Sequence, residues 1–283
     1  MTPQPMPEGV CDCHMHVFDR RFAPLPDAMY REATAQDYLA LAARRGIRRA
    51  VVVQPSGYGF DNRCTLDAVA AMGAGARAIV VVAPDTPEAE LRRLHAAGAR
   101  GVRFMLLRHG GLGWTELAPM ADAVAPLGWH LNLQFDGHQL PARLDDLKRL
   151  PVDVVIDHVG AFVGGTRPQD APFKALLALL ETGRAWVKLS GPYTHRMSAI
   201  GRPGYPEVAA LARILIDEFP QRCLWASDWP HVSEADVLPD DERALAVLGW
   251  LDEPALRQRI CVENPAHLYG LSPGDTLNTK GTS

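Results

Sequence analysis

The sequence lacks any apolar run of membrane-spanning length, and no basic segment followed by an apolar stretch stands at its start. A spanning helix needs about 20 consecutive apolar residues, and a secretory leader needs a basic region before its apolar core. Their absence argues against a membrane protein and against secretion by that route. We therefore expect a cytoplasmic protein.

An excess of positive charge is also lacking. The 283 residues contain 29 Lys and Arg against 33 Asp and Glu, which gives a formal net charge of -4. This balance predicts neither nucleic acid nor an anionic membrane as a partner. Lysine is scarce and occurs only at Lys148, Lys174, Lys188 and Lys280. Arginines therefore supply most of the cationic groups, and local arginines could bind a small anion.

Paired cysteine motifs are missing as well. The five cysteines are Cys11, Cys13, Cys64, Cys223 and Cys261. An odd number without a paired motif is typical of reduced thiols in a cytosolic protein. Cys11 and Cys13 are expected to be alternating residues of a strand and not part of a zinc knuckle.

Eight short apolar runs alternate with segments of helical periodicity, which is typical of a (β/α)8 TIM barrel. We expect a single barrel domain over residues 10–272, with mobile tails at 1–9 and 273–283. An open doubly wound sheet is the alternative, but no Gly-x-Gly-x-x-Gly turn follows the first strand. The predicted strands are 10–17, 50–54, 78–82, 101–106, 130–135, 152–158, 186–190 and 223–228. The predicted helices are 35–45, 66–73, 87–97, 116–126, 140–150, 172–183 and 206–219.

Four ionisable residues stand at or near the carboxyl ends of predicted strands, where barrel enzymes place their active sites. They are His14, His16, His158 and Asp228. His14 and His16 are two residues apart and so share one face of a strand. Each residue alone has a structural explanation, such as a hydrogen-bonded interior histidine or a helix cap. Burial of all four at three strand ends costs free energy unless they serve a purpose.

Five segments together resemble the amidohydrolase superfamily, in particular its branch of 2-pyrone-4,6-dicarboxylate lactonase and related sugar-acid lactone enzymes. The resemblance extends from about residue 10 to residue 265. It implies a barrel hydrolase whose substrate is a lactone. The segments are 11–19, 53–62, 101–104, 156–160 and 225–231.

The resemblance also bears on metal binding. Zinc-dependent members of the superfamily use the first-strand histidine pair, histidines on strands five and six, and an aspartate on strand eight. This sequence has Asn132 and Gln134 on strand five, and Arg103 on strand four would repel a cation. We therefore predict a site without metal or other cofactor. A mononuclear zinc hydrolase or decarboxylase remains an alternative.

The predicted mechanism assigns a role to each residue of the site. Asp228 takes a proton from water, and His14, His16 and His158 donate hydrogen bonds to the carbonyl oxygen as it gains charge. Arginines anchor a carboxylate, because the planar guanidinium matches its geometry. The expected substrate-binding residues are Arg103, Arg108, Arg196, Tyr58, Ser56, Gln134, Tyr193 and His231.

The expected partner is a small anionic lactone that resembles 2-pyrone-4,6-dicarboxylate. A hydrolase or isomerase of a galactarolactone-like sugar acid is the second hypothesis, and a non-enzymatic binding module is a third. The oligomeric state is left open.

Overall fold

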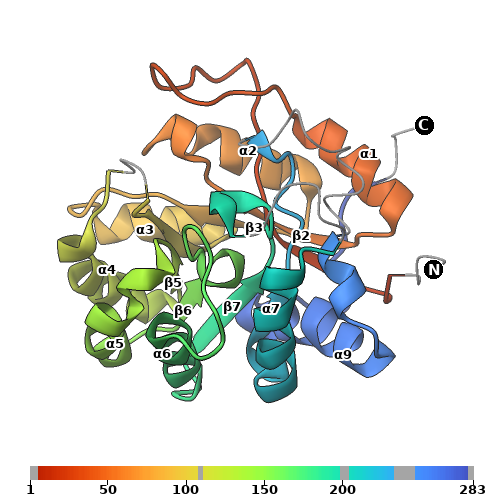
Figure 1. The fold of residues 1–283 in the computed structure, drawn as a ribbon. Helices are drawn as coiled ribbons and strands as arrows, with labels where there is room; N and C mark the ends of the chain where they lie inside the picture. Colours follow the sequence, from red (N-terminus) through yellow and green to blue (C-terminus); the bar gives the residue numbers. More distant parts are fainter. Residues whose placement is uncertain (1–5, 108–110, 198–203, 233–245, 280–283) are drawn as a thin grey trace.

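The computed structural model describes residues 6–107, 111–197, 204–232 and 246–279. Eight parallel strands follow one another around a single sheet in the order of the sequence, and helices cover the outside (Figure 1). This arrangement confirms the predicted (β/α)8 barrel. The strands are β1 Cys11–Met15, β2 Arg49–Val53, β3 Ala76–Val80, β4 Ala99–Met105, β5 His130–Gln134, β6 Val154–Ile156, β7 Ala185–Leu189 and β8 Cys223–Trp225.

All seven predicted helices are present. The first helix shows why the boundaries were predictable from the sequence. Thr34 and Asp37 form a capping box at its start, and Gly46 ends it in the left-handed conformation with a φ of 74°. The helices are α1 Ala35–Arg45, α2 Arg63–Met72, α3 Glu88–Ala96, α4 Leu117–Val124, α5 Leu140–Arg149, α6 Ala171–Leu180, α7 Pro206–Glu218, α9 Pro254–Gln258 and α10 Asn264–Tyr269.

The interior of the barrel is packed and is not a channel. A small core cluster contains Cys13 of β1, Val53 of β2, Val155 of β6 and Leu224 of β8, together with Tyr269 of α10. Strands this far apart around the sheet contact one another only across a closed barrel. A second and larger core cluster includes side chains of both the strands and the surrounding helices.

The seam between β1 and β8 differs from the regular ladder. Strand β8 ends at Trp225, three residues before the predicted end, and in the described part of the chain an isolated bridge between Met15 and Trp229 joins this segment to the first strand. The backbone nitrogen of Asp228 donates to the carbonyl oxygen of His14 at 2.9 Å, and that of His16 donates to Trp229 at 2.8 Å. The register of β1 against β2 shifts between Asp12 and Met15. This irregularity lies next to the predicted site, where bulges commonly re-aim side chains.

Part of the expected C-terminal tail packs against the barrel. The side chain of Leu277 is buried. Its backbone nitrogen donates to the carbonyl oxygen of Arg48 at 2.8 Å, and the next residue, Asn278, donates to Met72 at 2.9 Å. The chain is therefore held to the barrel by backbone hydrogen bonds beyond residue 272.

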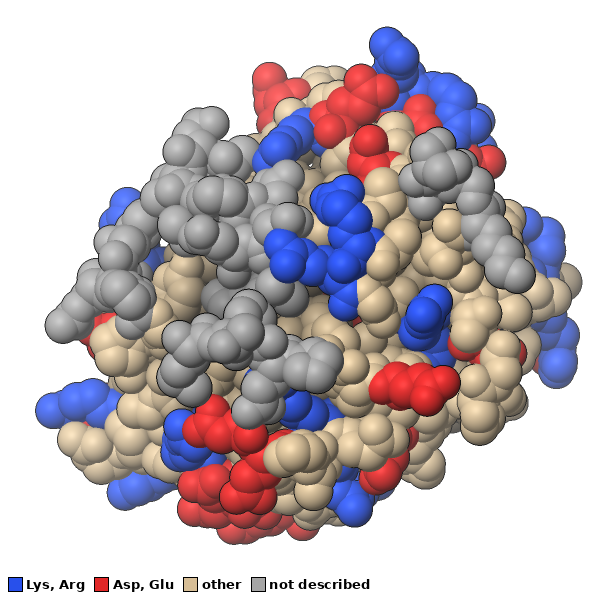
Figure 2. All heavy atoms as spheres, turned by 90° about the vertical axis from the view of Figure 1, so that its right-hand side faces the viewer, with Lys and Arg blue, Asp and Glu red and all other residues tan. Residues whose placement is uncertain are grey.

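The surface agrees with the mildly acidic composition. Basic and acidic side chains are interspersed on the face shown in Figure 2, so this face does not present one continuous basic surface. Among the described residues, the helices are too short or too polar to cross a bilayer.

Candidate active site

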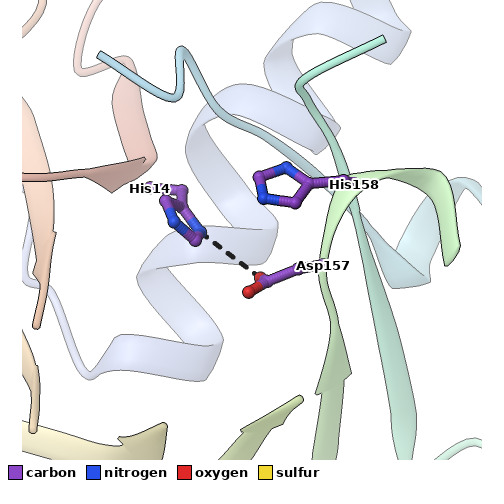
Figure 3. A group of neighbouring side chains, drawn as sticks. All are labelled: His14, Asp157 and His158. Carbon is purple, nitrogen blue, oxygen red and sulfur yellow. Dashed lines mark ion pairs between the residues drawn. The ribbon is translucent and has the colours of Figure 1, made fainter. Parts of the chain in front are cut away.

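The predicted catalytic residues meet at the carboxyl ends of the strands. His14 lies on β1 and His16 directly after it, His158 follows β6, and Asp228 follows β8. His14 faces Asp157, which precedes His158, and its Nδ1 lies 3.3 Å from Asp157 Oδ1 (Figure 3). The barrel thus brings together residues that are more than 200 positions apart in the sequence.

Left-handed backbone conformations accompany these strand ends. The φ angle is 53° at His158, 55° at Val159, 62° at Asp228 and 59° at His231. Such angles are uncommon outside glycine and persist only where the surroundings hold them. Here they turn the chain sharply after β6 and β8, so that His158 and Asp228 lie beside the histidines of β1.

The two histidines of the first strand form a pair. Nε2 of His14 lies 3.2 Å from Nε2 of His16, and Nδ1 of His16 lies 2.7 Å from the carbonyl oxygen of Val53. A carbonyl oxygen only accepts hydrogen bonds, so Nδ1 of His16 carries the proton. Nε2 of a neutral His16 is therefore an acceptor.

A buried lysine lies behind this pair. Nζ of Lys188 on β7 lies 2.5 Å from Asn132 Oδ1, 3.1 Å from His14 Nδ1 and 3.2 Å from Asp157 Oδ1. Asn132 in turn donates to Asp157 Oδ2 at 2.8 Å. Burial alone would raise the pKa of Asp157, but Lys188 and His14 outweigh it and hold that pKa well below its usual value. The carboxylate and the ammonium thus form a buried ion pair beneath the site.

Asp228 has the properties of a general base. Its Oδ1 lies 3.8 Å from His14 Nε2 and 3.9 Å from His158 Nε2, and Tyr193 donates to its Oδ2 at 3.4 Å. Burial, followed by repulsion from Asp157, raises the pKa of Asp228 to about 7, although Arg103 and Tyr193 oppose the shift. A base with a pKa near the working pH combines ionisation with an appreciable affinity for the proton.

The surrounding histidines are neutral. Burial, followed by repulsion from Arg103, lowers the pKa of His16 to about 3. Burial also lowers the pKa of His158 to about 3, although Asp157 opposes the shift. Neutral imidazoles each offer one donor and one acceptor. The donor of His16 is used on Val53, which contradicts its predicted role as a donor to the carbonyl oxygen. His158 can still polarise a carbonyl group without competing with Asp228 for the proton.

A solvent-open cavity of about 100 Å³ lies above these groups. Its wall combines polar groups with an apolar surface. Arg103 is 3% exposed, and it donates to the carbonyl oxygen of Gln54 at 2.6 Å and to Gln134 Oε1 at 2.7 Å. The wall is formed by His16, Phe18, Met29, Pro55, Ser56, Gly57, Arg103, Met105, Leu107, Gln134, His158, Thr194, His195, Asp228 and Val232.

The predicted residues take different places around this cavity. Asp228, His16, His158, Arg103, Gln134 and Ser56 line it, whereas His14 is fully buried behind them. Among the described residues, Tyr58, Tyr193, His231 and Arg196 are not part of the wall. The Tyr58 hydroxyl bonds the backbone of Asp19, Tyr193 contacts both Asp228 and His231, and Arg196 is exposed. Arg108 lies outside the described residues.

His195 is a cavity residue that was not predicted from the sequence. This residue follows β7, lines the cavity and lies with Nε2 3.1 Å from Nε2 of Gln134. Its position in a loop after a barrel strand was the available signal, since such loops form the active-site face. It was overlooked because no motif marks it.

The donor set can be tested against a divalent cation. His14, His16 and Asp228 place one ligand atom each within 4.8 Å of one another. A histidine that ligates a metal normally donates its second N–H to a carboxylate or carbonyl oxygen. His16 does so, whereas the second nitrogen of His14 lies 3.1 Å from the ammonium of Lys188 and 3.3 Å from Asp157 Oδ1. Lys188 and Arg103 are buried cations beside this donor set, and their charge opposes the binding of a divalent metal ion.

Comparisons with known proteins show which proteins this chain resembles. The sequence model of the amidohydrolase family matches residues 11–271. A D-galactarolactone isomerase of Agrobacterium fabrum is 36% identical, with 96% of this chain and 95% of the relative covered. A 2-pyrone-4,6-dicarboxylate hydrolase of Comamonas testosteroni is 35% identical, with 93% and 91% covered.

One solved structure adds a comparison of the fold. It is a probable 2-pyrone-4,6-dicarboxylic acid hydrolase of Acinetobacter baumannii with citric acid bound. It superposes with a TM-score of 0.82 at 27% identity, over 93% of this chain and 99% of that chain. The likeness therefore covers the whole barrel.

Proposed function

The chain belongs to the amidohydrolase family, and we propose that it hydrolyses a small carboxylated lactone without a metal ion. One observation carries this proposal. Asp228, whose pKa is raised to about 7, lies among neutral histidines at a cavity that Arg103 also lines. This arrangement supports the presence of a base, a hydrogen-bond donor and an anion anchor at one site. The similar 2-pyrone-4,6-dicarboxylate hydrolase supports the substrate class.

The reaction proceeds in two steps. Asp228 removes a proton from a water molecule while the water oxygen attacks the lactone carbonyl carbon. The N–H group of His158, which lines the cavity, stabilises the negative charge on the carbonyl oxygen. The ring C–O bond then breaks, and the departing oxygen receives the proton from Asp228. The product is the open-chain acid, and Asp228 returns to its ionised form.

Arg103 is proposed to anchor the carboxylate of the substrate. Two of its nitrogens are held by Gln54 and Gln134, and its Nε is buried without a partner among the described residues. A guanidinium has five N–H donors, so donors remain for a substrate. The apolar part of the wall, which includes Phe18 and Met105, suits the flat face of a ring.

Isomerisation of a sugar-acid lactone is the second candidate. Asp228 could take the proton from a hydroxyl group of the substrate in place of water, so that this oxygen attacks the carbonyl and a different ring forms. The similarity to a D-galactarolactone isomerase favours it. Ser56, Gln134 and Thr194 add polar groups to the wall that could bind hydroxyl groups.

A substrate screen in ¹⁸O-labelled water tests the proposal. We expect 2-pyrone-4,6-dicarboxylate or a related lactone to release acid and to incorporate one labelled oxygen. Isomerisation of D-galactarolactone would leave the label out and release no acid. The rate should be unchanged after exhaustive chelation. If neither substrate set reacts, or chelation abolishes turnover, the proposal is wrong.

The pH profile of kcat/KM should have one acidic limb with a midpoint near pH 7. Asp228 must be ionised to act as a base, so kcat/KM falls about tenfold per pH unit below its pKa and levels off above it. His16 and His158 titrate near pH 3 and do not contribute in this range. Tyr193→Phe removes a hydrogen bond that lowers the pKa of Asp228, so its midpoint should move to higher pH.

Arg103→Met should raise KM for a carboxylated lactone by roughly 10- to 100-fold, because a hydrogen bond to a charged group contributes about 1.5–3 kcal/mol. The same variant should change KM much less for an uncharged lactone of similar size. Arg92→Met, an exposed residue of α3, serves as the matched control. Equal losses on charged and uncharged lactones would show that Arg103 does not bind the carboxylate.

A further inference from the structure

We propose that Lys188 is a positioning residue that fixes the tautomer of His14, so that Nε2 of His14 carries the proton and faces Nε2 of His16. Lys188 does not contact the cavity and has no part in the mechanism derived above. It is fully buried on β7, where a charged side chain is costly unless it serves a purpose. The effect of this positioning role on catalysis rests on the proposed lactone hydrolysis.

The surroundings of the ammonium group supply the first argument. An ammonium has three donors, and three groups surround Nζ of Lys188: Asn132 Oδ1, Asp157 Oδ1 and His14 Nδ1. Asn132 Oδ1 accepts one of the protons, and Asp157 Oδ1 forms an ion pair with the ammonium. If Nδ1 of His14 also carried a proton, two N–H groups would face each other at 3.1 Å in a dry interior. Nδ1 of His14 is therefore the acceptor.

The opposite end of the same ring supplies an independent argument. Nε2 of His14 lies 3.2 Å from Nε2 of His16, which is an acceptor because Nδ1 of His16 donates to Val53. Two lone pairs would face each other if Nε2 of His14 also lacked its proton. Burial and the nearby ammonium lower the pKa of His14 well below its usual value, so the ring is neutral and carries one proton. The contact of Nε2 with His16 and the contact of Nδ1 with Lys188 both favour this proton on Nε2.

The function of this arrangement follows from the position of the proton. Nε2 of His14 lies 3.2 Å from His16 and 3.8 Å from Asp228 Oδ1, and both of these residues line the cavity. The N–H group is therefore directed at Nε2 of His16, and so holds the ring of a residue that lines the cavity. Without Lys188, Nδ1 of His14 would have Asp157 Oδ1 at 3.3 Å as its partner, and the proton would move to Nδ1. His14 would then change from a donor to an acceptor.

The wild-type protein provides a test that needs no altered lysine. Long-range ¹H–¹⁵N spectra of ¹⁵N-histidine-labelled protein distinguish the two neutral tautomers, and His14→Gln assigns the His14 signals by their disappearance. We expect the Nε2-protonated form of His14 and the Nδ1-protonated form of His16. A His14 that is protonated at Nδ1, or is doubly protonated near neutral pH, overturns the proposal.

Lys188→Met tests the cause. The folded variant should show His14 protonated at Nδ1, with kcat reduced by roughly tenfold, because the hydrogen bond from His14 that holds His16 at the cavity is lost, and KM changed much less. Lys174→Met, an exposed lysine on α6, should change neither the spectrum nor kcat. A Lys188→Met protein that keeps Nε2 protonated, or that switches tautomer with full kcat, overturns the proposal. If the wild type hydrolyses no lactone, the proposed function fails, while the spectra still decide the tautomer.

Discussion

Asp228→Asn is expected to lower kcat by about 10²–10⁴-fold while the barrel stays folded. Asparagine has the same shape as aspartate but cannot take a proton from water. The loss corresponds to about 3–5 kcal/mol of activation free energy. Steady-state kinetics on the substrate that the screen identifies would measure it, and circular dichroism would report on the fold.

The backbone conformation at Asp228 suits asparagine, so this substitution changes the chemistry of the side chain and leaves the backbone in place. Its φ of 62° lies in the left-handed region, which asparagine tolerates better than most other residues. The hydrogen bond from its backbone nitrogen to His14 does not depend on the side chain. Asp217→Asn on the exposed side of α7 is the matched control. If Asp228→Asn keeps more than about a tenth of wild-type kcat, Asp228 is not the general base, because a base normally contributes at least about 10²-fold.

The barrel itself was predictable because each strand carries its own signal. Runs such as Val51-Val52-Val53 are apolar on both faces, as expected for strands buried between a barrel interior and outer helices. The end of β8 was misplaced because the sequence 223–228 continues without a breaker. The structure ends the strand at Trp225, and Asp228 then takes a left-handed conformation that side-chain patterns do not reveal.

The residues of the site were predictable as a group, but their interactions were not. The sequence shows that His14, His158 and Asp228 stand at strand ends, and the closed barrel necessarily brings strand ends together. Which nitrogen of His14 faces Lys188, and which faces His16, depends on register and on the irregular seam of β1. A shift of one residue would turn these side chains to the other face.

Asp12 shows most clearly what the sequence could not reveal. It precedes the histidine pair of the first strand, but its carboxylate points away from the cavity and joins three segments. It accepts hydrogen bonds from the backbone of His14 at 3.2 Å, from the Tyr38 hydroxyl at 2.8 Å, and from the backbone and hydroxyl of Ser227 at 2.8 and 2.5 Å. Burial raises the pKa of Asp12, and these hydrogen bonds oppose the shift.

Asp12→Ala is therefore expected to lower the free energy of unfolding by about 3–5 kcal/mol, because it leaves several buried donors without an acceptor. Tyr38→Phe removes one of the same hydrogen bonds and keeps the aromatic ring, so its cost should be about 1 kcal/mol. Urea denaturation with an unchanged m value would measure both. Equal effects of the two substitutions would mean that the links to His14 and Ser227 contribute little. A much larger effect of Asp12→Ala would show that this carboxylate, and not the short β8, holds the seam at which Asp228 lies.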